Sequence, residues 1–221
     1  MHRYFIKFAY SGTSYHGWQI QENAHTIQAE LENALSNIIS TEIKVTGAGR
    51  TDTGVHAKEM YAHFDSIAEL NQDELCYKLN RFIPDDIVVY DILKVKSDAH
   101  ARFDALKRTY NYFITKSKNP FEYEFSWYLH YDLDIDKMNE FSVELMKYKD
   151  FSSFCKSHTD TKTNLCDIFV AEWKNKNDLL VFEITANRFL RNMVRAIVGT
   201  MVDVGRGKIN LEEFKQIITQ I

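Results

Sequence analysis

Residues 47–57 carry side chains whose types and spacing suit chemistry on a bound ligand. The segment reads Gly-Ala-Gly-Arg-Thr-Asp-Thr-Gly-Val-His-Ala and places one carboxylate, Asp52, two residues after the guanidinium of Arg50. Glycine lets a backbone approach a ligand closely. A nearby positive charge keeps a carboxylate ionised, and an ionised, positioned carboxylate acts as a nucleophile or a base. The alternative for a bare Arg-x-Asp pair is a tight turn with a surface ion pair, which stabilises a fold very little.

A second candidate is a group of three arginines near the C-terminal end. Arg188, Arg191 and Arg195 are spaced by three and four residues, which predicts that they share one face of a helix. Apolar residues fall mainly on the other face of this predicted amphipathic helix: Leu190, Met193, Val194, Ile197 and Met201. A solvated helix face is the plain alternative. Arginines without acidic partners favour phosphate binding.

The bulk composition is that of an ordinary globular protein. The chain has 221 residues, of which 45% are hydrophobic and 26% charged, and its net charge of −4 does not itself indicate a nucleic-acid binder. No apolar run approaches the roughly 20 residues that span a bilayer, so we expect no membrane segment. Cys76, Cys155 and Cys166 are far apart and odd in number, which predicts reduced thiols, a cytoplasmic protein and no metal site.

Hydrophobic periodicity predicts the elements of the first half. Alternation predicts strands over residues 3–10, 60–64 and 87–95, with a short extended stretch over residues 43–46. Thr26 is expected to cap a helix that runs to residue 38, and Asn71 with Glu74 resembles a capping box that opens a helix ending near Arg81. The order is β-α-β-β-α-β, the ferredoxin-like arrangement.

The second half repeats this order without its last strand. We expect a strand over residues 107–115, a helix over 134–147, a hairpin with strands over 168–173 and 179–186, and then the arginine-bearing helix, which should stop near Gly205 by a glycine C-cap. Residues 207–221 predict one more short helix rather than a strand.

The predicted fold class is therefore α+β. Two ferredoxin-like, RRM-like halves are expected, residues 1–98 with the Asp52 loop and residues 99–221 with the arginine-rich helix. Their mixed, mainly antiparallel sheets should lie side by side and leave a central cleft. The second half should lack its last strand.

Several separate motifs, in order along nearly the whole chain, resemble the tRNA pseudouridine synthase A family. Phe-Ala-Tyr-Ser-Gly-Thr-Ser-Tyr-His-Gly-Trp-Gln at residues 8–19 is similar to the family's first strand and the following loop, and residues 47–57 resemble its catalytic loop. The other similar segments are residues 79–87, 99–105, 108–112, 150–155 and 186–195.

The resemblance implies an isomerase that converts uridine to pseudouridine in the anticodon stem-loop of tRNA, at tRNA positions 38, 39 and 40. Asp52 matches the catalytic aspartate, either as nucleophile or as base on the sugar. Arg50 resembles the residue that enters the stem when the target base flips out. Tyr110 corresponds to the tyrosine that stacks on that base, and Arg195 to the arginine that pairs with the catalytic carboxylate.

Further expectations follow from the same resemblance. Arg108, Arg188 and Arg191 are expected to contact the substrate, no cofactor is required because substrate and product are isomers, and family members work as homodimers. Cys166 stands where the family usually carries an arginine. Family members also continue beyond the last helix into a strand that lines the active site, so we expect that this chain lacks that segment.

Two rival functions are compatible with the residues. Two ferredoxin-like sheets that bear aromatic side chains such as Tyr110 and Tyr112 also suit a non-catalytic RNA-binding module. The other rival function is that of a hydrolase, which would use Asp52 to cut the glycosidic bond and would release the base. The Gly-Arg-Thr-Asp loop favours catalysis over binding alone, because binding does not need it.

Overall fold

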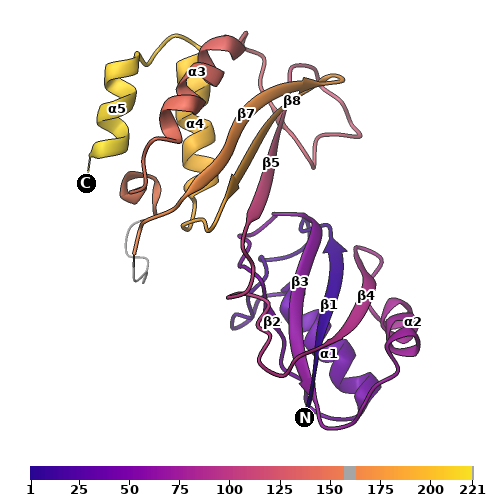
Figure 1. Cartoon of the computed structure of the whole chain (residues 1–221). Helices are drawn as coiled ribbons and strands as arrows, with labels where there is room; N and C mark the ends of the chain where they lie inside the picture. Colours follow the sequence, from indigo (N-terminus) through magenta and orange to yellow (C-terminus); the bar gives the residue numbers. More distant parts are fainter. Residues whose placement is uncertain (157–162, 221) are drawn as a thin grey trace. The chain divides into compact units, whose positions relative to one another are not determined.

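The computed structural model describes residues 1–156 and 163–220, and the chain divides into two compact units, Met1–Ala105 and Leu106–Ile221. Each unit combines one four-stranded sheet with its own helices (Figure 1). The predicted α+β class with two separate sheets is thereby confirmed.

The first unit has the predicted β-α-β-β-α-β order. Its strands pair antiparallel in the order β2-β3-β1-β4, which is the ferredoxin-like arrangement. The elements are β1 (His2–Tyr10), α1 (Ile27–Ile39), β2 (Thr46–Gly47), β3 (Ala57–Ser66), α2 (Gln72–Phe82) and β4 (Ile87–Val95).

The core of the first unit lies between one face of this sheet and the two helices. Tyr4, Ile6 and Phe8 alternate along β1, are fully buried, and belong to the same hydrophobic cluster as Leu31 of α1 and Leu79 of α2. The period of two on β1 and the helical spacing on α1 therefore meet at one apolar layer.

The two predicted caps differ in outcome. Asn71 accepts a hydrogen bond from the backbone N–H of Glu74, which is one of the two bonds of the expected capping box. Thr26 occupies the N-cap of α1, but its buried hydroxyl makes no cap bond.

Residues 99–105 belong to the first unit, so the boundary lies after residue 105 and not after residue 98. Arg3 donates from Nη1 to the carbonyl of Ala99 over 3.0 Å, and the backbone N–H of Ala101 donates to Nδ1 of His63 over 3.2 Å. Burial lowers the pKa of His63, which suits a neutral ring that accepts this bond. Sequence periodicity gave no indication of these contacts, because the segment is neither helix nor strand.

The second unit begins with β5 and carries its sheet in the order β6-β5-β8-β7. Its elements are β5 (Arg108–Thr115), β6 (Trp127–Tyr128), α3 (Ile135–Leu145), the 3-10 turn η1 (Ser152–Phe154), β7 (Ile168–Lys176), β8 (Leu179–Ala186), α4 (Met193–Gly205) and α5 (Leu211–Thr219). No strand follows α4 in the described residues. The position beside β5 is instead taken by β6, a two-residue parallel strand that the sequence did not predict.

The prediction that Arg188, Arg191 and Arg195 share one helix face is wrong. Helix α4 begins only at Met193, after Asn192 with a left-handed φ of 69°, so Arg188 and Arg191 lie in the loop that joins β8 to α4. A helix cannot continue through a left-handed residue. Helix α4 ends at Gly205, as predicted, but its C-cap is Arg206 and the left-handed glycine is Gly207, with φ +73°.

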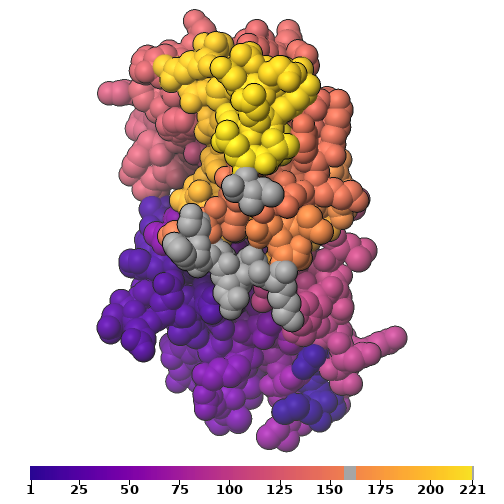
Figure 2. Space-filling model, turned by 90° about the vertical axis from the view of Figure 1, so that its left-hand side faces the viewer, coloured from indigo at the N-terminus to yellow at the C-terminus, as the bar shows by residue number. Residues whose placement is uncertain are grey.

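The core of the second unit lies between its sheet and helices α3, α4 and α5. A Cβ on Gly205 would lie 2.5 Å from the sulfur of Met138, so this glycine permits the close approach of α4 to α3. Helix α5, visible on the surface in Figure 2, is opened by a capping box of Asn210 and Glu213 and packs Phe214 on Phe141 of α3 at a ring distance of 5.0 Å. No helix among the described residues is long and apolar enough to cross a bilayer.

Candidate active site

The loop that carries Asp52 joins β2 to β3 in the first unit and spans residues 48–56; we call it the Asp52 loop. It starts at Gly47, which pairs with Ala62 of the neighbouring strand. A Cβ on Gly47 would lie 2.6 Å from the ring of Trp18, so only glycine lets this indole pack against the start of the loop.

A second loop, residues 11–26 between β1 and α1, holds the Asp52 loop through its backbone; we call it the supporting loop. The N–H of Trp18 donates to the carbonyl of Thr51 over 3.1 Å, and the N–H of Gly54 donates to the carbonyl of Tyr15 over 3.3 Å. At the end of β1, the hydroxyl of Tyr10 lies 2.8 Å from Oγ1 of Thr51. Asp52 is therefore held from both sides along the chain.

Two glycines allow the two loops to touch backbone to backbone. Gly17 has φ +88°, and a Cβ there would lie 2.4 Å from the carbonyl oxygen of Thr51. A Cβ on Gly12 would lie 2.1 Å from the carbonyl oxygen of Val55. Residues 11–19 were singled out from the sequence only by the resemblance, and the structure shows that they support the Asp52 loop.

The supporting loop is itself anchored in the first unit. The hydroxyl of Tyr15 donates to Oδ1 of Asp86 over 2.6 Å, and the N–H of Ser11 donates to the carbonyl of Asp86 over 2.8 Å. Tyr15 is 2% exposed, and burial together with the Asp86 carboxylate raises the pKa of its hydroxyl. The neutral phenol is thus retained as a donor, and the contact ties the loop to the start of β4.

Asp52 and Arg50 both lie in this held loop, as predicted. Asp52 is half-buried and its carbonyl accepts the N–H of Val55 over 3.2 Å, which closes a turn directly after the carboxylate, while the Arg50 side chain is exposed. A carboxylate on a loop with fixed ends is positioned for attack or for proton abstraction, and an exposed arginine two residues earlier is free of the core.

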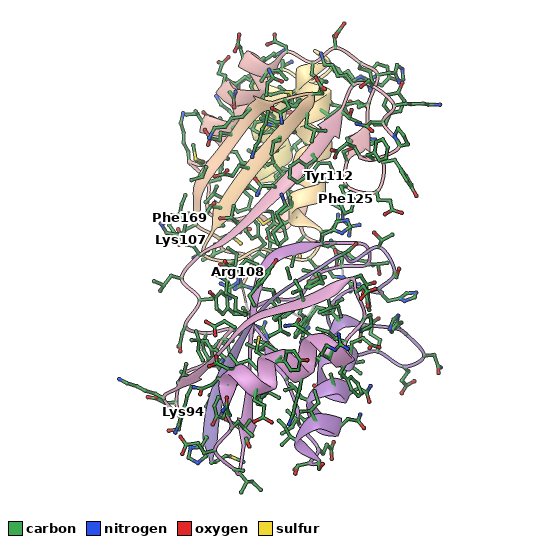
Figure 3. All side chains as sticks on the ribbon, turned by 90° about the vertical axis from the view of Figure 1, so that its right-hand side faces the viewer. Lys94, Lys107, Arg108, Tyr112, Phe125 and Phe169 are labelled. Carbon is green, nitrogen blue, oxygen red and sulfur yellow. The ribbon has the colours of Figure 1, made fainter. Side chains whose placement is uncertain are left out.

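The second unit places Arg108 and Tyr110 on β5, opposite Ala186 and Ile184 of β8. Arg108, labelled in Figure 3, donates from Nη1 to the carbonyl of Asn187 over 2.8 Å. The ring of Tyr110 meets the edge of Phe189 at a centroid distance of 5.0 Å and an angle of 85°. Tyr110 is half-buried, so one part of its ring packs on the unit and another part faces outward.

The loop of residues 187–192, which we call the arginine loop, carries Phe189, Arg188 and Arg191 and is tethered at both ends. The side chain of Asn187 accepts the N–H of Asp167 over 2.9 Å and donates to the Asp167 carboxylate over 3.0 Å. Near the other end, the carbonyl of Arg191 accepts the N–H of Lys156 over 3.0 Å. The loop therefore has a defined conformation and presents its arginines without a helix.

Arg195 lies in the first turn of α4, close to the aromatic residues of β5. Its charge acts to lower the pKa of Tyr112 against burial, which raises it, so the guanidinium lies near Tyr112. Tyr112 is two residues after Tyr110 on the same side of β5, and its ring meets Trp127 of β6 edge-on at 6.4 Å. Tyr112 was named from the sequence only as an aromatic of the rival RNA-binding module and was given no role in catalysis.

Cys166, at the position where an arginine was expected, is buried. It is 1% exposed, and burial raises the pKa of its thiol to about 11, while the charge of Arg188 acts in the opposite direction. Arg188 thus lies near this position and supplies a positive charge from the neighbouring loop. No group of three or more histidine, cysteine or acidic side chains in the described part of the chain is arranged to hold a metal ion.

Arg50 and Asp52 thus lie in one loop of the first unit. In the second unit, Arg108 and Tyr110 contact residues of the arginine loop, and Arg195 lies on the helix that follows this loop. A family model described as tRNA pseudouridine synthase matches residues 7–104 and 145–220. These two ranges include both the Asp52 loop and the arginine loop.

Curated proteins named tRNA pseudouridine synthase A are similar over nearly the full chain. One from Bacteroides fragilis is 54% identical over 220 residues, which cover 99% of this chain and 87% of that protein. One from Bacteroides thetaiotaomicron is 52% identical and covers 100% of this chain and 83% of that protein, and one from Halalkalibacterium halodurans is 40% identical over 99% of this chain and 84% of that protein. The chain belongs to the tRNA pseudouridine synthase family, whose members are isomerases.

Proposed function

We propose that this protein isomerises uridine to pseudouridine in the anticodon stem-loop of tRNA. The observation that carries the proposal is the Asp52 loop, held on both sides of its carboxylate by the supporting loop, in a chain of this family. RNA binding alone does not need an anchored carboxylate. The chemistry breaks the C1′–N1 bond and forms a C1′–C5 bond, while C5 loses a proton and N1 gains one, so no external reactant is consumed.

The roles follow the chemistry of the side chains. Asp52 engages the sugar–base linkage as a nucleophile or as a base on the sugar. The exposed Arg50 occupies the stem when the target base leaves its stack. Tyr110 stacks on the flipped base, a contact of about 1–3 kcal/mol. By the family resemblance, Arg195 is the residue proposed to pair with the Asp52 carboxylate.

The arginines of the second unit hold the RNA backbone. Arg188 and Arg191 from the arginine loop and Arg108 from β5 supply positive charge on a body whose net charge is −4. Phosphate contacts by arginine position an RNA without reading its sequence. These arginines thus supply local positive charge for RNA binding on a protein whose net charge is negative.

Replacement of Asp52 tests the proposal. Asp52→Asn keeps the shape of the side chain and removes its negative charge, so pseudouridine formation in unmodified tRNA should fall at least about 1,000-fold, as for other catalytic groups. Binding of the tRNA should stay within severalfold of the unchanged protein. Pseudouridine is mapped by carbodiimide-dependent primer extension, and affinity is measured by filter binding. Retained pseudouridine formation would remove Asp52 from the chemistry.

The same incubation separates the two rival functions. Free uracil released from tRNA would identify a glycosidic hydrolase, and tRNA binding without any modified nucleotide would identify a binding module. Pseudouridine at the three anticodon-stem positions that the family resemblance implies would support the site specificity as well.

We also propose a homodimer and a cytoplasmic location. Exposed aromatics of residues 121–128 support self-association, since Phe121 is 86% and Tyr123 70% exposed, and large exposed apolar groups mark interaction surfaces. The three free cysteines suit a reducing compartment. Sedimentation equilibrium tests the dimer, and cell fractionation tests the location.

A further inference from the structure

We propose that His56 is a positioning residue, whose unprotonated Nδ1 fastens the Asp52 loop to the supporting loop. The inference rests on the proposed function, because His56 is assigned a role in the reaction through Asp52 and not by contact with the RNA. The residue is four positions after Asp52, and no role was predicted for it from the sequence.

The contact that carries the inference joins a side chain to a backbone. Nδ1 of His56 lies 3.1 Å from the backbone nitrogen of Gly12, which donates its N–H, and 3.3 Å from Oγ of Ser11. Both partners belong to the start of the supporting loop, which Asp86 holds through Ser11. His56 is half-buried, so the contact is partly shielded from water.

The identity of the donor fixes the state of the imidazole. A backbone N–H only donates, so the ring nitrogen that faces Gly12 must accept and carries no proton. The neutral ring with its proton on Nε2 satisfies this requirement, and the imidazolium ion does not, since both of its nitrogens donate. His56 therefore holds the loop as a neutral side chain of one tautomer.

The position of the contact explains why it matters for Asp52. Before Asp52, Thr51 is held by Tyr10 and by the N–H of Trp18. After Asp52, the chain is held by the N–H of Gly54 on Tyr15 and by His56 on Gly12. Loss of the His56 contact would remove one of the two contacts that hold the loop after Asp52. A displacement of about 1 Å at a reacting group costs about 100-fold in rate.

Two amide replacements distinguish positioning from proton transfer. In His56→Asn the amide oxygen is attached to Cγ, as Nδ1 is, so it can accept the N–H of Gly12. In His56→Gln the amide lies one carbon farther out, where Nε2 was, and the Gly12 N–H loses its acceptor. Neither amide titrates, so a general acid or base at position 56 would be lost equally in both variants.

The first measurement is single-turnover pseudouridine formation at saturating enzyme, together with the Kd for tRNA. We expect His56→Asn to keep its rate constant within about threefold of the unchanged protein and His56→Gln to lose about 10- to 100-fold. The Kd should stay within about threefold in both, because His56 does not contact the RNA in this assignment.

The second measurement reads the contact without activity. In ¹⁵N-labelled protein, exchange of the Gly12 amide hydrogen should be slow in the unchanged protein and in His56→Asn, and faster in His56→Gln. The ¹⁵N shifts of His56 should report a proton on Nε2. Circular dichroism melts identify a variant that fails to fold, and amide exchange in the unchanged protein then still tests the contact.

The outcomes are distinct. Equal rates for both variants, whether retained or lost, overturn the assignment, as does a proton on Nδ1 of the unchanged protein. An unchanged protein that forms no pseudouridine overturns the proposed function. In that case Gly12 exchange and the His56 tautomer still decide whether the loop contact exists.

Discussion

The ring of Tyr110 on β5 meets the edge of Phe189 from the arginine loop at 5.0 Å and 85°. Edge-to-face pairs of this kind contribute about 0.5–1.5 kcal/mol to stability, in addition to the free energy gained from the surface area that they bury. The contact links the residue proposed to stack on the base with the loop proposed to bind phosphate. The orientation of Tyr110 therefore depends on a residue that the sequence analysis placed inside a helix.

Phe189→Ala should lower kcat/KM for tRNA roughly fivefold, which corresponds to about 1 kcal/mol, because the Tyr110 ring loses its edge contact. Phe189→Tyr keeps the ring and serves as the matched control. Both variants are assayed below their melting temperatures, so that unfolding does not contribute. An Ala variant as active as the Tyr variant would show that Tyr110 is oriented without Phe189.

Arg188→Gln combined with Arg191→Gln should weaken tRNA binding and flatten its salt dependence. Each lost phosphate contact lowers the slope of log K against log salt by about 0.7–0.9, so two contacts remove roughly 1.5. The control with the same charge change is Lys208→Gln with Lys215→Gln, whose lysines pair with Asp203 and Glu212. A slope that stays the same in the arginine variant would place the loop away from the RNA.

Ionisation of Tyr15 should reduce stability at alkaline pH. Its pKa in the folded protein is raised above the ordinary 10.0, first by burial and then by the Asp86 carboxylate. Below pH 10 the phenol is protonated in both states, so the contribution is fully present. Above pH 10 the unfolded chain loses the proton first, and the free energy of unfolding falls by up to about 1.4 kcal/mol per pH unit.

Urea unfolding between pH 8 and pH 11 measures this loss. Tyr15→Phe removes the ionisable hydroxyl and should show a shallower alkaline decline, with lower stability at pH 8 because the bond to Asp86 is lost. Tyr90→Phe, at a tyrosine that is 54% exposed, is the control and should follow the unchanged protein. Identical slopes for Tyr15→Phe and the unchanged protein would contradict the prediction.

Cys166 should resist alkylation in the folded protein. Burial raises the pKa of its thiol to about 11, and the thiolate is the form that reacts, so at pH 8 both access and ionisation are low. Iodoacetamide labelling followed by peptide mass spectrometry should modify Cys155 before Cys166. Labelling after urea unfolding should modify both. Rapid labelling of Cys166 in the native protein would show that this position is open to solvent.

Local patterns predicted most of the secondary structure. The spacing of apolar residues predicts which face of an element is buried. It did so for the alternating Tyr4, Ile6 and Phe8 of β1 and for Ile27 and Leu31 of α1. The strand over residues 87–95 matches β4 at both ends. The catalytic role of Asp52 stays a prediction, which the glycine-rich loop suggested and the family resemblance made specific.

The errors fall where local pattern and tertiary contact disagree. Arg188 and Arg191 have helical spacing, yet Asn192 adopts a left-handed conformation and the hydrogen bonds of Asn187 hold the preceding residues as a loop. Residues 99–105 have no periodic pattern, and their place in the first unit depends on Arg3 and His63. Spacing alone carries no information on such distant partners.

Residue types and their order were sufficient to indicate the α+β class, the order of the strands in the first unit and the carboxylate at position 52. The tertiary structure decided how that carboxylate is held. The Gly12 and Gly17 backbones approach Val55 and Thr51 from a loop some 40 residues away, at the distances that a Cβ would forbid. Such contacts arise from the folding of distant segments onto one another, so they leave only glycines, and no periodic pattern, in the sequence.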